Sequence, residues 1–135
     1  ISESIGNLQS LDQLRVVNTG MGGPLPAGLF NLINLQVLEL SVNDFSGPLS
    51  VDFGKLANVT QIDLSYNTFT GTIPTVFASL EYLRTLLLHS NDLTGSVSAG
   101  ICNRTGDAFF DINRLTADCG GSPPEVSCDC CHECF

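Results

Sequence analysis

The chain has 135 residues, enough for one domain, and carries 14 acidic against 5 basic side chains, a formal net charge of −9. The basic residues form no cluster, which argues against nucleic acid and anionic membrane surfaces as partners, because both attract clustered Lys and Arg. No apolar run approaches the roughly 18 residues of a membrane-spanning helix, so no membrane span is predicted in this chain.

The first ten residues, 1–10, align with the back half of a 24-residue unit that the following chain repeats. Ile1 falls in register with Leu25, Leu49 and Ile73. The chain is therefore expected to begin inside a truncated repeat and to expose an apolar face that such stacks normally cover. This predicts either a longer protein or the removal of a preceding part.

Four complete units follow without a slip in the period, which is the signature of a stacked repeat. Each unit holds two apolar residues separated by one, the alternation of a strand with one buried face. The units span 11–34, 35–58, 59–82 and 83–106, and their apolar pairs are Leu14/Val16, Leu38/Leu40, Ile62/Leu64 and Leu86/Leu88. Stacking the units predicts a parallel sheet built from these strands.

An asparagine follows the strand in three of the units: Asn43, Asn67 and Asn91. The chain must turn there, and an inward-facing amide can hydrogen-bond to the free backbone groups of adjacent turns. Because buried polar groups are normally satisfied in this way, we interpret the three residues as a structural ladder and not as binding residues. The glycine four residues after each asparagine indicates a positive φ or a close backbone approach.

The combined pattern, LxxLxLxxNxLxGxIP, resembles the plant-type leucine-rich repeat, and the resemblance covers residues 1 to about 117. It implies an α/β repeat fold, a right-handed solenoid with a curved parallel β-sheet on its concave side and short helical turns on its convex side. The Gly-x-Ile-Pro stem resembles the plant-type feature that adds a second short strand to each repeat.

Residues 107–135 are expected to form a partial repeat and a Cys-rich C-terminal cap. Phe110 and Ile112 align with the apolar pair of the fourth unit, which predicts a fifth strand at about 109–113. Leu115 then occupies the ladder position, and the pattern dissolves. The segment that follows is interpreted as a cap that hides the last apolar face of the stack.

All six cysteines lie in the last 34 residues of the chain: Cys102, Cys119, Cys128, Cys130, Cys131 and Cys134. Six cysteines allow 15 pairings, among which the sequence does not choose. A short irregular tail needs cross-links, so we predict three disulfides formed in an oxidising compartment. A zinc site that includes His132 is the alternative, although it lacks the paired C-x-x-C spacing of common zinc modules. A catalytic redox thiol is disfavoured, because no C-x-x-C lies on a thioredoxin-like βαβ unit.

The tail carries a second resemblance, to secreted leucine-rich-repeat proteins of diatoms and related algae. The matching residues are Ala117-Asp118-Cys119, Pro124-Glu125-Val126, Cys128, Cys130-Cys131 and Cys134. The resemblance implies an extracellular or cell-surface protein. Two N-glycosylation sequons, beginning at Asn58 and Asn103, agree with this location.

Side chains that alternate with the leucines are expected to form the concave surface. The candidate ligand-binding residues there are Arg15, Glu39, Asp63, Ser65, Tyr66, Leu87, His89 and Asp111. Tyr66 beside His89, with Asp63 and Val42 close by, is the best candidate for an interface hot spot, since aromatic residues dominate interface energetics. The alternative interpretation is the ordinary solvated side of a sheet.

Catalysis is not predicted. Ser65 and His89, with a neighbouring aspartate, imitate a catalytic triad, but an open sheet offers no water-excluded pocket and no evident oxyanion donors. Glu39 and Asp63 are adjacent carboxylates that suit calcium, yet Arg15 beside them makes a row of ion pairs the better interpretation. No metal or other cofactor is therefore predicted.

These features predict a non-enzymatic extracellular module that recognises a protein, peptide or glycan through its concave face. Plant-type repeats in receptor ectodomains and in secreted enzyme inhibitors resemble this use, an analogy at the level of the fold. The alternative is a structural component of an extracellular or cell-surface assembly. Such a component would contact its partners through the rims, the convex side or the N-terminal end.

Overall fold

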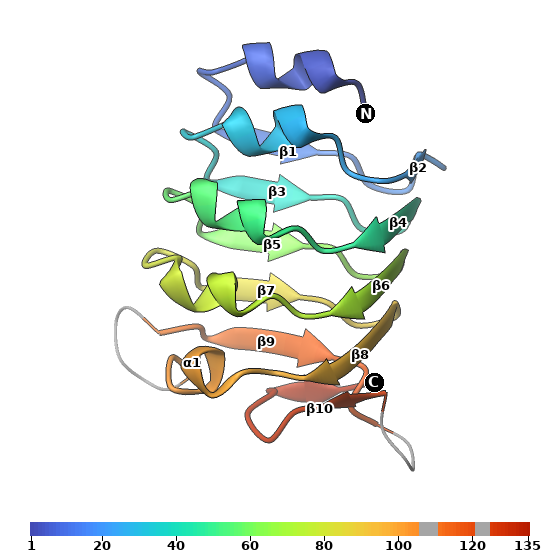
Figure 1. Cartoon of the computed structure of the whole chain (residues 1–135), viewed down its shortest axis with the longest axis vertical. Coiled ribbons are helices and arrows are strands. Elements are labelled where there is room, and N and C mark those ends of the chain that lie inside the picture. Colours follow the sequence, from blue (N-terminus) through green and yellow to red (C-terminus); the bar gives the residue numbers. More distant parts are fainter. Residues whose placement is uncertain (106–110, 121–124) are drawn as a thin grey trace.

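The computed structural model describes residues 1–105, 111–120 and 125–135, and it shows a stack of similar chain turns (Figure 1). Each turn passes from one short strand to a second and then to a short helical turn. The elements in chain order are η1 (Glu3–Asn7), β1 (Gln13–Arg15), β2 (Gly22–Gly23), η2 (Ala27–Asn31), β3 (Val37–Glu39), β4 (Asp44–Pro48), η3 (Val51–Lys55), β5 (Gln61–Asp63), β6 (Thr68–Thr72), η4 (Thr75–Ser79), β7 (Thr85–Leu87), β8 (Asp92–Ser96), α1 (Ala99–Cys102), β9 (Arg114–Ala117), β10 (Val126–Ser127) and β11 (Glu133–Cys134). The predicted repeat solenoid is confirmed.

One side of the stack is a six-stranded parallel sheet in the order β1-β3-β5-β7-β9-β11, hereafter the first sheet. Leu14 pairs with Leu38, Leu38 with Ile62, and Ile62 with Leu86. The last three of these side chains are 0% exposed. The apolar alternation in the sequence therefore predicted these strands and their buried face correctly.

A second parallel sheet joins five strands in the order β10-β8-β6-β4-β2. Its inward side chains include Phe45, Phe69 and Leu93, which are 0, 1 and 1% exposed. Gly47 has φ of +83° beside them, a conformation that glycine adopts without penalty. The second strand implied by the Gly-x-Ile-Pro stem is thus present.

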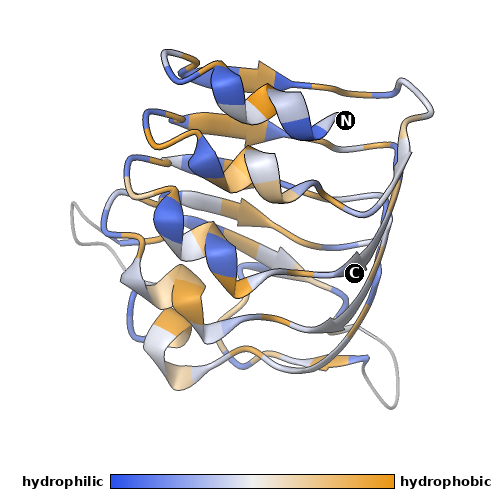
Figure 2. Ribbon diagram, turned by 45° about the horizontal axis from the view of Figure 1, so that its top comes forward, coloured by the Kyte–Doolittle hydropathy of each residue, from blue (hydrophilic) through white to orange (hydrophobic). Residues whose placement is uncertain are grey.

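Short helical turns line the convex side, across the core from the first sheet (Figure 1). The turns η1 to η4 carry both hydrophilic and hydrophobic residues, as expected of elements with one buried side, whereas α1 carries mainly hydrophobic ones (Figure 2). Phe53 lies between Phe30 and Phe77, with 5.1 Å between the centroids of successive rings. Within the described residues, no helix combines the length and the apolar character that crossing a membrane requires.

Asparagine side chains join successive turns inside the stack. Asn67 shares its Nδ2 hydrogens between the carbonyl oxygens of Leu40 at 2.9 Å and Leu64 at 3.1 Å, and its Oδ1 accepts the backbone N–H of Phe45 at 3.0 Å. Asn91 makes the same kinds of bond one turn later. Each amide therefore satisfies buried backbone groups of two turns at once.

The predicted fifth strand at 109–113 is wrong. Strand β9 begins at Arg114, and Leu115 pairs with Leu86 at an offset of 29 residues instead of 24. Ile112 forms an isolated bridge with Thr105, while residues 109 and 110 lie outside the described residues. The last repeat contains five extra residues before its strand, so Leu115 is a buried strand residue and not a replacement for the ladder asparagine.

The Cys-rich tail adds one short strand to each sheet, because β10 pairs with β8 and β11 pairs with β9. Three disulfides hold it: Cys102–Cys130, Cys119–Cys134 and Cys128–Cys131. The predicted disulfide-rich cap is therefore confirmed. A zinc site would need thiolates, which sulfur atoms in disulfides do not provide.

Candidate binding face

The first sheet arranges its outward side chains in rows that cross the strands. The register places Arg15, Glu39, Asp63 and Leu87 in one row. Because β9 and β11 extend the sheet, Thr116 and Glu133 continue this row into the cap.

Asp111, which was predicted in this row, lies elsewhere. It precedes β9 and lines a hollow of about 440 Å³ with Glu81, Tyr82 and Arg104. Thr116 takes its place beside β7. The prediction failed because it carried the 24-residue spacing into a repeat that is longer.

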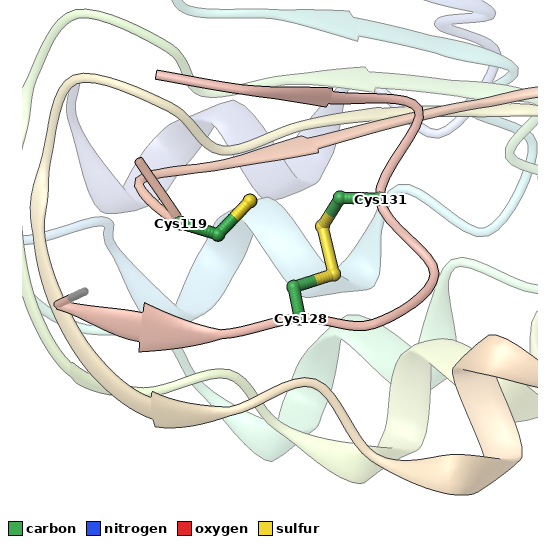
Figure 3. A group of neighbouring side chains, drawn as sticks. All are labelled: Cys119, Cys128 and Cys131. Atoms are coloured by element: carbon green, nitrogen blue, oxygen red, sulfur yellow. A yellow bond between two sulfur atoms is a disulfide. The ribbon is translucent and has the colours of Figure 1, made fainter. Parts of the chain in front are cut away.

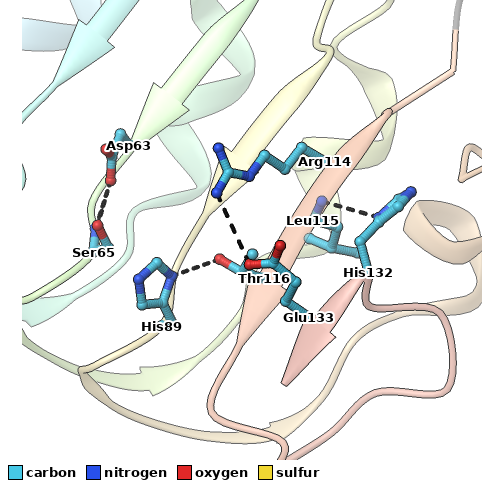
Figure 4. A network of polar contacts seen from close by, with 8 residues as sticks. All are labelled: Asp63, Ser65, His89, Arg114, Leu115, Thr116, His132 and Glu133. Carbon is cyan, nitrogen blue, oxygen red and sulfur yellow. Dashed lines mark hydrogen bonds and ion pairs between the residues drawn. The ribbon is translucent and has the colours of Figure 1, made fainter. Parts of the chain in front are cut away.

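The charged side chains in and beside this row form ion pairs and hydrogen bonds. Arg15 Nη1 lies 3.3 Å from Glu39 Oε2, and Glu39 Oε1 accepts a hydrogen bond from Gln61 Nε2 at 2.6 Å. Arg114 and Glu133 form a longer ion pair of 3.9 Å at the cap (Figure 4). Exposed pairs of this kind contribute about 0–1 kcal/mol, so they order the surface more than they stabilise the fold.

The serine and histidine that imitate a catalytic pair have different partners. Ser65 Oγ donates to Asp63 Oδ1 at 2.6 Å, and the backbone N–H of Ser65 donates to the same oxygen at 3.0 Å. His89 Nδ1 lies 2.7 Å from Thr116 Oγ1 (Figure 4). A nucleophilic serine requires its base within hydrogen-bond reach, whereas Ser65 donates to a carboxylate instead.

His89 is 6% exposed, and this burial lowers its pKa below the usual value because the charged imidazolium loses solvation. The carboxylates of Asp63, Asp118 and Glu133 oppose the effect, and Arg114 adds to it. His89 is therefore neutral at neutral pH and contributes a flat aromatic surface to the face.

Three rings meet at the C-terminal end of the face. Tyr66 approaches His89 edge-on, with centroids 5.1 Å apart and planes at 82°. Phe135 stacks on the other side of His89 at 4.0 Å and 16°. Tyr66 and Phe135 remain 51 and 48% exposed. We call these two exposed rings and the buried imidazole between them the aromatic cluster.

The cap positions Phe135 through its backbone. The N–H of Phe135 donates to the carbonyl of Ala117 at 3.2 Å, and its carbonyl accepts the N–H of Gly120 at 2.9 Å. The neighbouring Cys134 is bonded to Cys119. The sequence prediction missed Phe135 because it lies outside the repeat, and only its apolar character next to the final cysteine signals a packed position.

A polar hollow of about 510 Å³ adjoins the aromatic cluster. It is lined by Asn67, Ser90, Asn91, Asp92, Asp118, Gly120, Glu125 and Phe135. Asp92 and Glu125 are exposed, so the hollow offers carboxylates next to an aromatic ring.

Tyr66 belongs to a series of turns with unusual backbone geometry. Asn18, Val42, Tyr66 and Ser90 have φ between +54° and +58°. This left-handed conformation costs a non-glycine residue about 1 kcal/mol and suits β-branched residues least. Val42, 45% exposed, and Tyr66 therefore stand where the backbone alone favours glycine or asparagine.

Three predicted binding residues are shielded from solvent. Ser65, Leu87 and His89 are 4, 8 and 6% exposed. The other predicted binding residues are exposed or half-buried. At this end of the sheet, the side chains that remain exposed beside the three shielded ones are those of Tyr66 and Phe135.

Residues 34–93 match the family model described as "Leucine rich repeat". A search of curated proteins found no significant match. Among solved structures, the ectodomain of the receptor kinase SOBIR1 from Arabidopsis thaliana is similar, with a TM-score of 0.79 and 26% identity, covering 95% of this chain and 65% of that one.

Two further solved structures are also similar. The plant peptide hormone receptor RGFR1 in complex with RGF2 has a TM-score of 0.74 and 31% identity, covering 86% of this chain and 19% of that one. A plant ice-binding protein has a TM-score of 0.75 and 32% identity, covering 86% of this chain and 38% of that one. The chain thus spans less than two thirds of each of the three proteins.

Proposed function

Because the chain is a leucine-rich-repeat protein, we propose that it is a non-enzymatic recognition module that binds an extended peptide segment on its concave face. The observation that carries this proposal is the aromatic cluster, in which Tyr66 and Phe135 stay half-exposed around His89. Exposed aromatic rings held rigidly are the usual energetic centres of interfaces. The similar receptor RGFR1 was solved with RGF2, which supports a peptide as the ligand class.

The chemistry of the face suggests which peptide it takes. An apolar or aromatic side chain would remove Tyr66 and Phe135 from water and gain the hydrophobic contribution of that burial. A neighbouring Lys or Arg would reach the hollow where Asp92 and Glu125 are exposed. With a net charge of −9, the chain also attracts a basic peptide from a distance.

An extracellular location fits this proposal. Three disulfides form and persist in oxidising compartments, in which secreted and cell-surface proteins fold. The sequon residues Asn58 and Asn103 are both exposed, and we propose that they are glycosylated. Loss of mass on treatment with an N-glycosidase, using protein from its native source, tests the modification.

Selection of a random-peptide display library on the folded protein tests the peptide proposal. We expect enriched sequences that combine an aromatic or aliphatic residue with Lys or Arg. Tyr66→Ala should weaken binding of a selected peptide at least about tenfold, as for a hot-spot residue. Calorimetric titration of the synthetic peptide measures the loss.

Tyr82→Ala is the matched control, because Tyr82 is 46% exposed at the rim and outside the aromatic cluster. Its affinity should equal that of the unmodified protein. Equal binding by Tyr66→Ala would remove the concave-face proposal. If substitutions at the rim abolished peptide binding and Tyr66→Ala did not, the result would favour the alternative function, a structural component of an extracellular assembly.

A second candidate function is ice binding by the second sheet. The outward positions of β6 and β8 carry hydroxyl groups on exposed residues, namely Thr68, Thr70, Thr72, Thr94 and Ser96. The register of these parallel strands, about 4.8 Å apart, places Thr72 opposite Thr94 and Thr70 opposite Asp92, so the hydroxyls form an exposed polar array that could match an ordered water surface. A similar solved structure is a plant ice-binding protein, which supports this candidate.

An ice-recrystallisation assay separates the two candidates. If the hydroxyl array binds ice, the protein should slow crystal growth, and Thr70→Tyr should abolish the effect by breaking the flat array. Thr75→Tyr, at an exposed position of η4, should leave it unchanged. No effect of the unmodified protein on crystal growth would eliminate this candidate without touching the peptide proposal.

A further inference from the structure

Two disulfides of the cap lie almost in contact. Cys119 is bonded to Cys134, and Cys128 is bonded to Cys131. The sulfur atoms of Cys119, Cys128 and Cys131 all lie within 4.8 Å of one another. Figure 3 shows the Cys119 sulfur directed toward the Cys128–Cys131 bond. A sulfur of one disulfide thus stands close to both sulfurs of the other.

The four cysteines differ in access to solvent. Cys134 is exposed, whereas Cys119, Cys128 and Cys131 are half-buried. An external thiol therefore meets the Cys119–Cys134 disulfide at its Cys134 side. Access decides which sulfur is attacked in thiol–disulfide exchange, together with the thiolate character of the attacking group.

We propose that these residues form a thiol–disulfide exchange site whose substrate is a small external thiol of the glutathione class. The thiolate of that molecule attacks Cys134 Sγ, breaks the Cys119–Cys134 bond and forms a mixed disulfide at Cys134. Cys119 leaves as a thiolate with the electron pair of the broken bond. It then attacks the sulfur of Cys128 or Cys131, forms a new disulfide and releases the other cysteine as a thiolate, which takes up a proton. The second step moves a disulfide without net oxidation or reduction.

Exchange would release the end of the chain from the first sheet. Strand β11 pairs with β9 through only two positions, Glu133 with Thr116 and Cys134 with Ala117. The covalent link from Cys119 to Cys134 fixes this short pairing, since a two-residue strand adds little stability alone. Without that link Phe135 would leave His89, and the imidazole would become exposed.

The remaining disulfide keeps the cap attached during exchange. Cys102, at the end of α1, is bonded to Cys130, and no sulfur of this pair belongs to the close group of three. The repeats therefore stay covered while β11 opens. This inference does not depend on the identity of any ligand of the concave face.

Cys134→Ser tests the exchange step, because it leaves Cys119 as a free thiol beside the intact Cys128–Cys131 bond. The purified folded protein is alkylated and its peptides are mapped by mass spectrometry. We expect the alkylated thiol at Cys128 or Cys131 as well as at Cys119. Label at Cys119 alone would overturn the proposal.

Cys130→Ser is the matched control, since it frees Cys102, whose sulfur lies outside the close group. Label is expected at Cys102 alone. Equal scrambling in both variants would show that the cap exchanges its disulfides without regard to proximity, and would also overturn the proposal.

The unmodified protein supplies a measurement that does not depend on how the variants fold. After brief exposure to reduced glutathione, the first adduct is expected on Cys134. The NMR signals of the His89 ring should shift at the same time, because Phe135 no longer stacks on it. A first adduct on another cysteine, or His89 signals that stay unchanged after the adduct forms, would contradict the proposed order of events.

Discussion

Asp118 Oδ1 lies 2.6 Å from the backbone nitrogen of Ser90 and accepts its hydrogen. The second oxygen, Oδ2, accepts the backbone N–H of Asn91 at 3.0 Å. In the preceding turn, the N–H groups of Tyr66 and Asn67 donate to backbone carbonyls of the next turn. One carboxylate therefore replaces two carbonyl groups at the place where the regular stack ends.

Asp118→Asn should lower the free energy of unfolding by about 1–3 kcal/mol, because the new NH₂ group faces a backbone donor and leaves it unsatisfied. Urea denaturation followed by circular dichroism measures the change. Asp92→Asn, at an exposed carboxylate of β8, is the matched control and should change stability by no more than about 0.5 kcal/mol. Equal stability of the two variants would show that the cap does not need the carboxylate.

Asn67→Ala should destabilise the fold by about 3 kcal/mol, because the buried N–H of Phe45 and the carbonyl groups around it lose their partner. Asn34→Ala offers a comparison, since that exposed side chain makes one bond, to the carbonyl of Gln9. It should destabilise by about 1 kcal/mol or less. If both variants lost a similar amount of stability, the buried asparagine would contribute no more to the fold than the exposed one.

Phe53→Ala should reduce the free energy of unfolding by about 3–5 kcal/mol, because it removes a ring that is 0% exposed between two others and leaves a cavity. Val51→Ala, two residues earlier on the same helical turn, changes a side chain that is 73% exposed. Its effect should stay within about 0.5 kcal/mol. Chemical denaturation of both proteins checks the difference.

The lowered pKa of His89 predicts a pH dependence of stability. The folded chain holds the proton of His89 less tightly than the unfolded chain, so the free energy of unfolding should fall as the pH drops below about 6.5. The decline due to this residue should end once the pH passes the lower pKa of the folded state.

His89→Gln removes this titration and keeps a polar side chain beside Thr116. The carboxylates that surround His89, those of Asp63, Asp118 and Glu133, are present in both proteins, so the comparison isolates the effect of residue 89. The stability advantage of the unmodified protein over the variant should therefore shrink from pH 7.5 to pH 5. A difference independent of pH would contradict the assigned role of burial.

The regular repeats could be predicted because several constraints agree at each turn. Leu38, Ile62 and Leu86 recur at a fixed spacing, each has a second leucine two positions later, and each precedes a turn-forming segment. Parallel strands in register bury all three against the same core. Period, polarity and turn chemistry thus specify one arrangement.

The last repeat could not be predicted in this way. Phe110-x-Ile112 and Leu115-x-Ala117 show the same apolar alternation, and only the backbone pairing of β9 with β7 selects the second. The position of Phe135 depends on β11, a two-residue strand outside the period. Its placement follows from a disulfide to Cys119, and disulfide pairing is decided by proximity in the folded chain.

The turns with positive φ have a practical consequence for protein engineering. The side chains of Val42 and Tyr66 are exposed and do not belong to the core. Glycine would adopt the backbone conformation of both residues with less strain. The same turn recurs at residues 18 and 90, so four variable positions follow one another along a rigid frame. Randomising them would vary a surface while leaving the leucines untouched, much as antibody loops vary on a constant sandwich. The solenoid would then serve as a scaffold for new binding specificities.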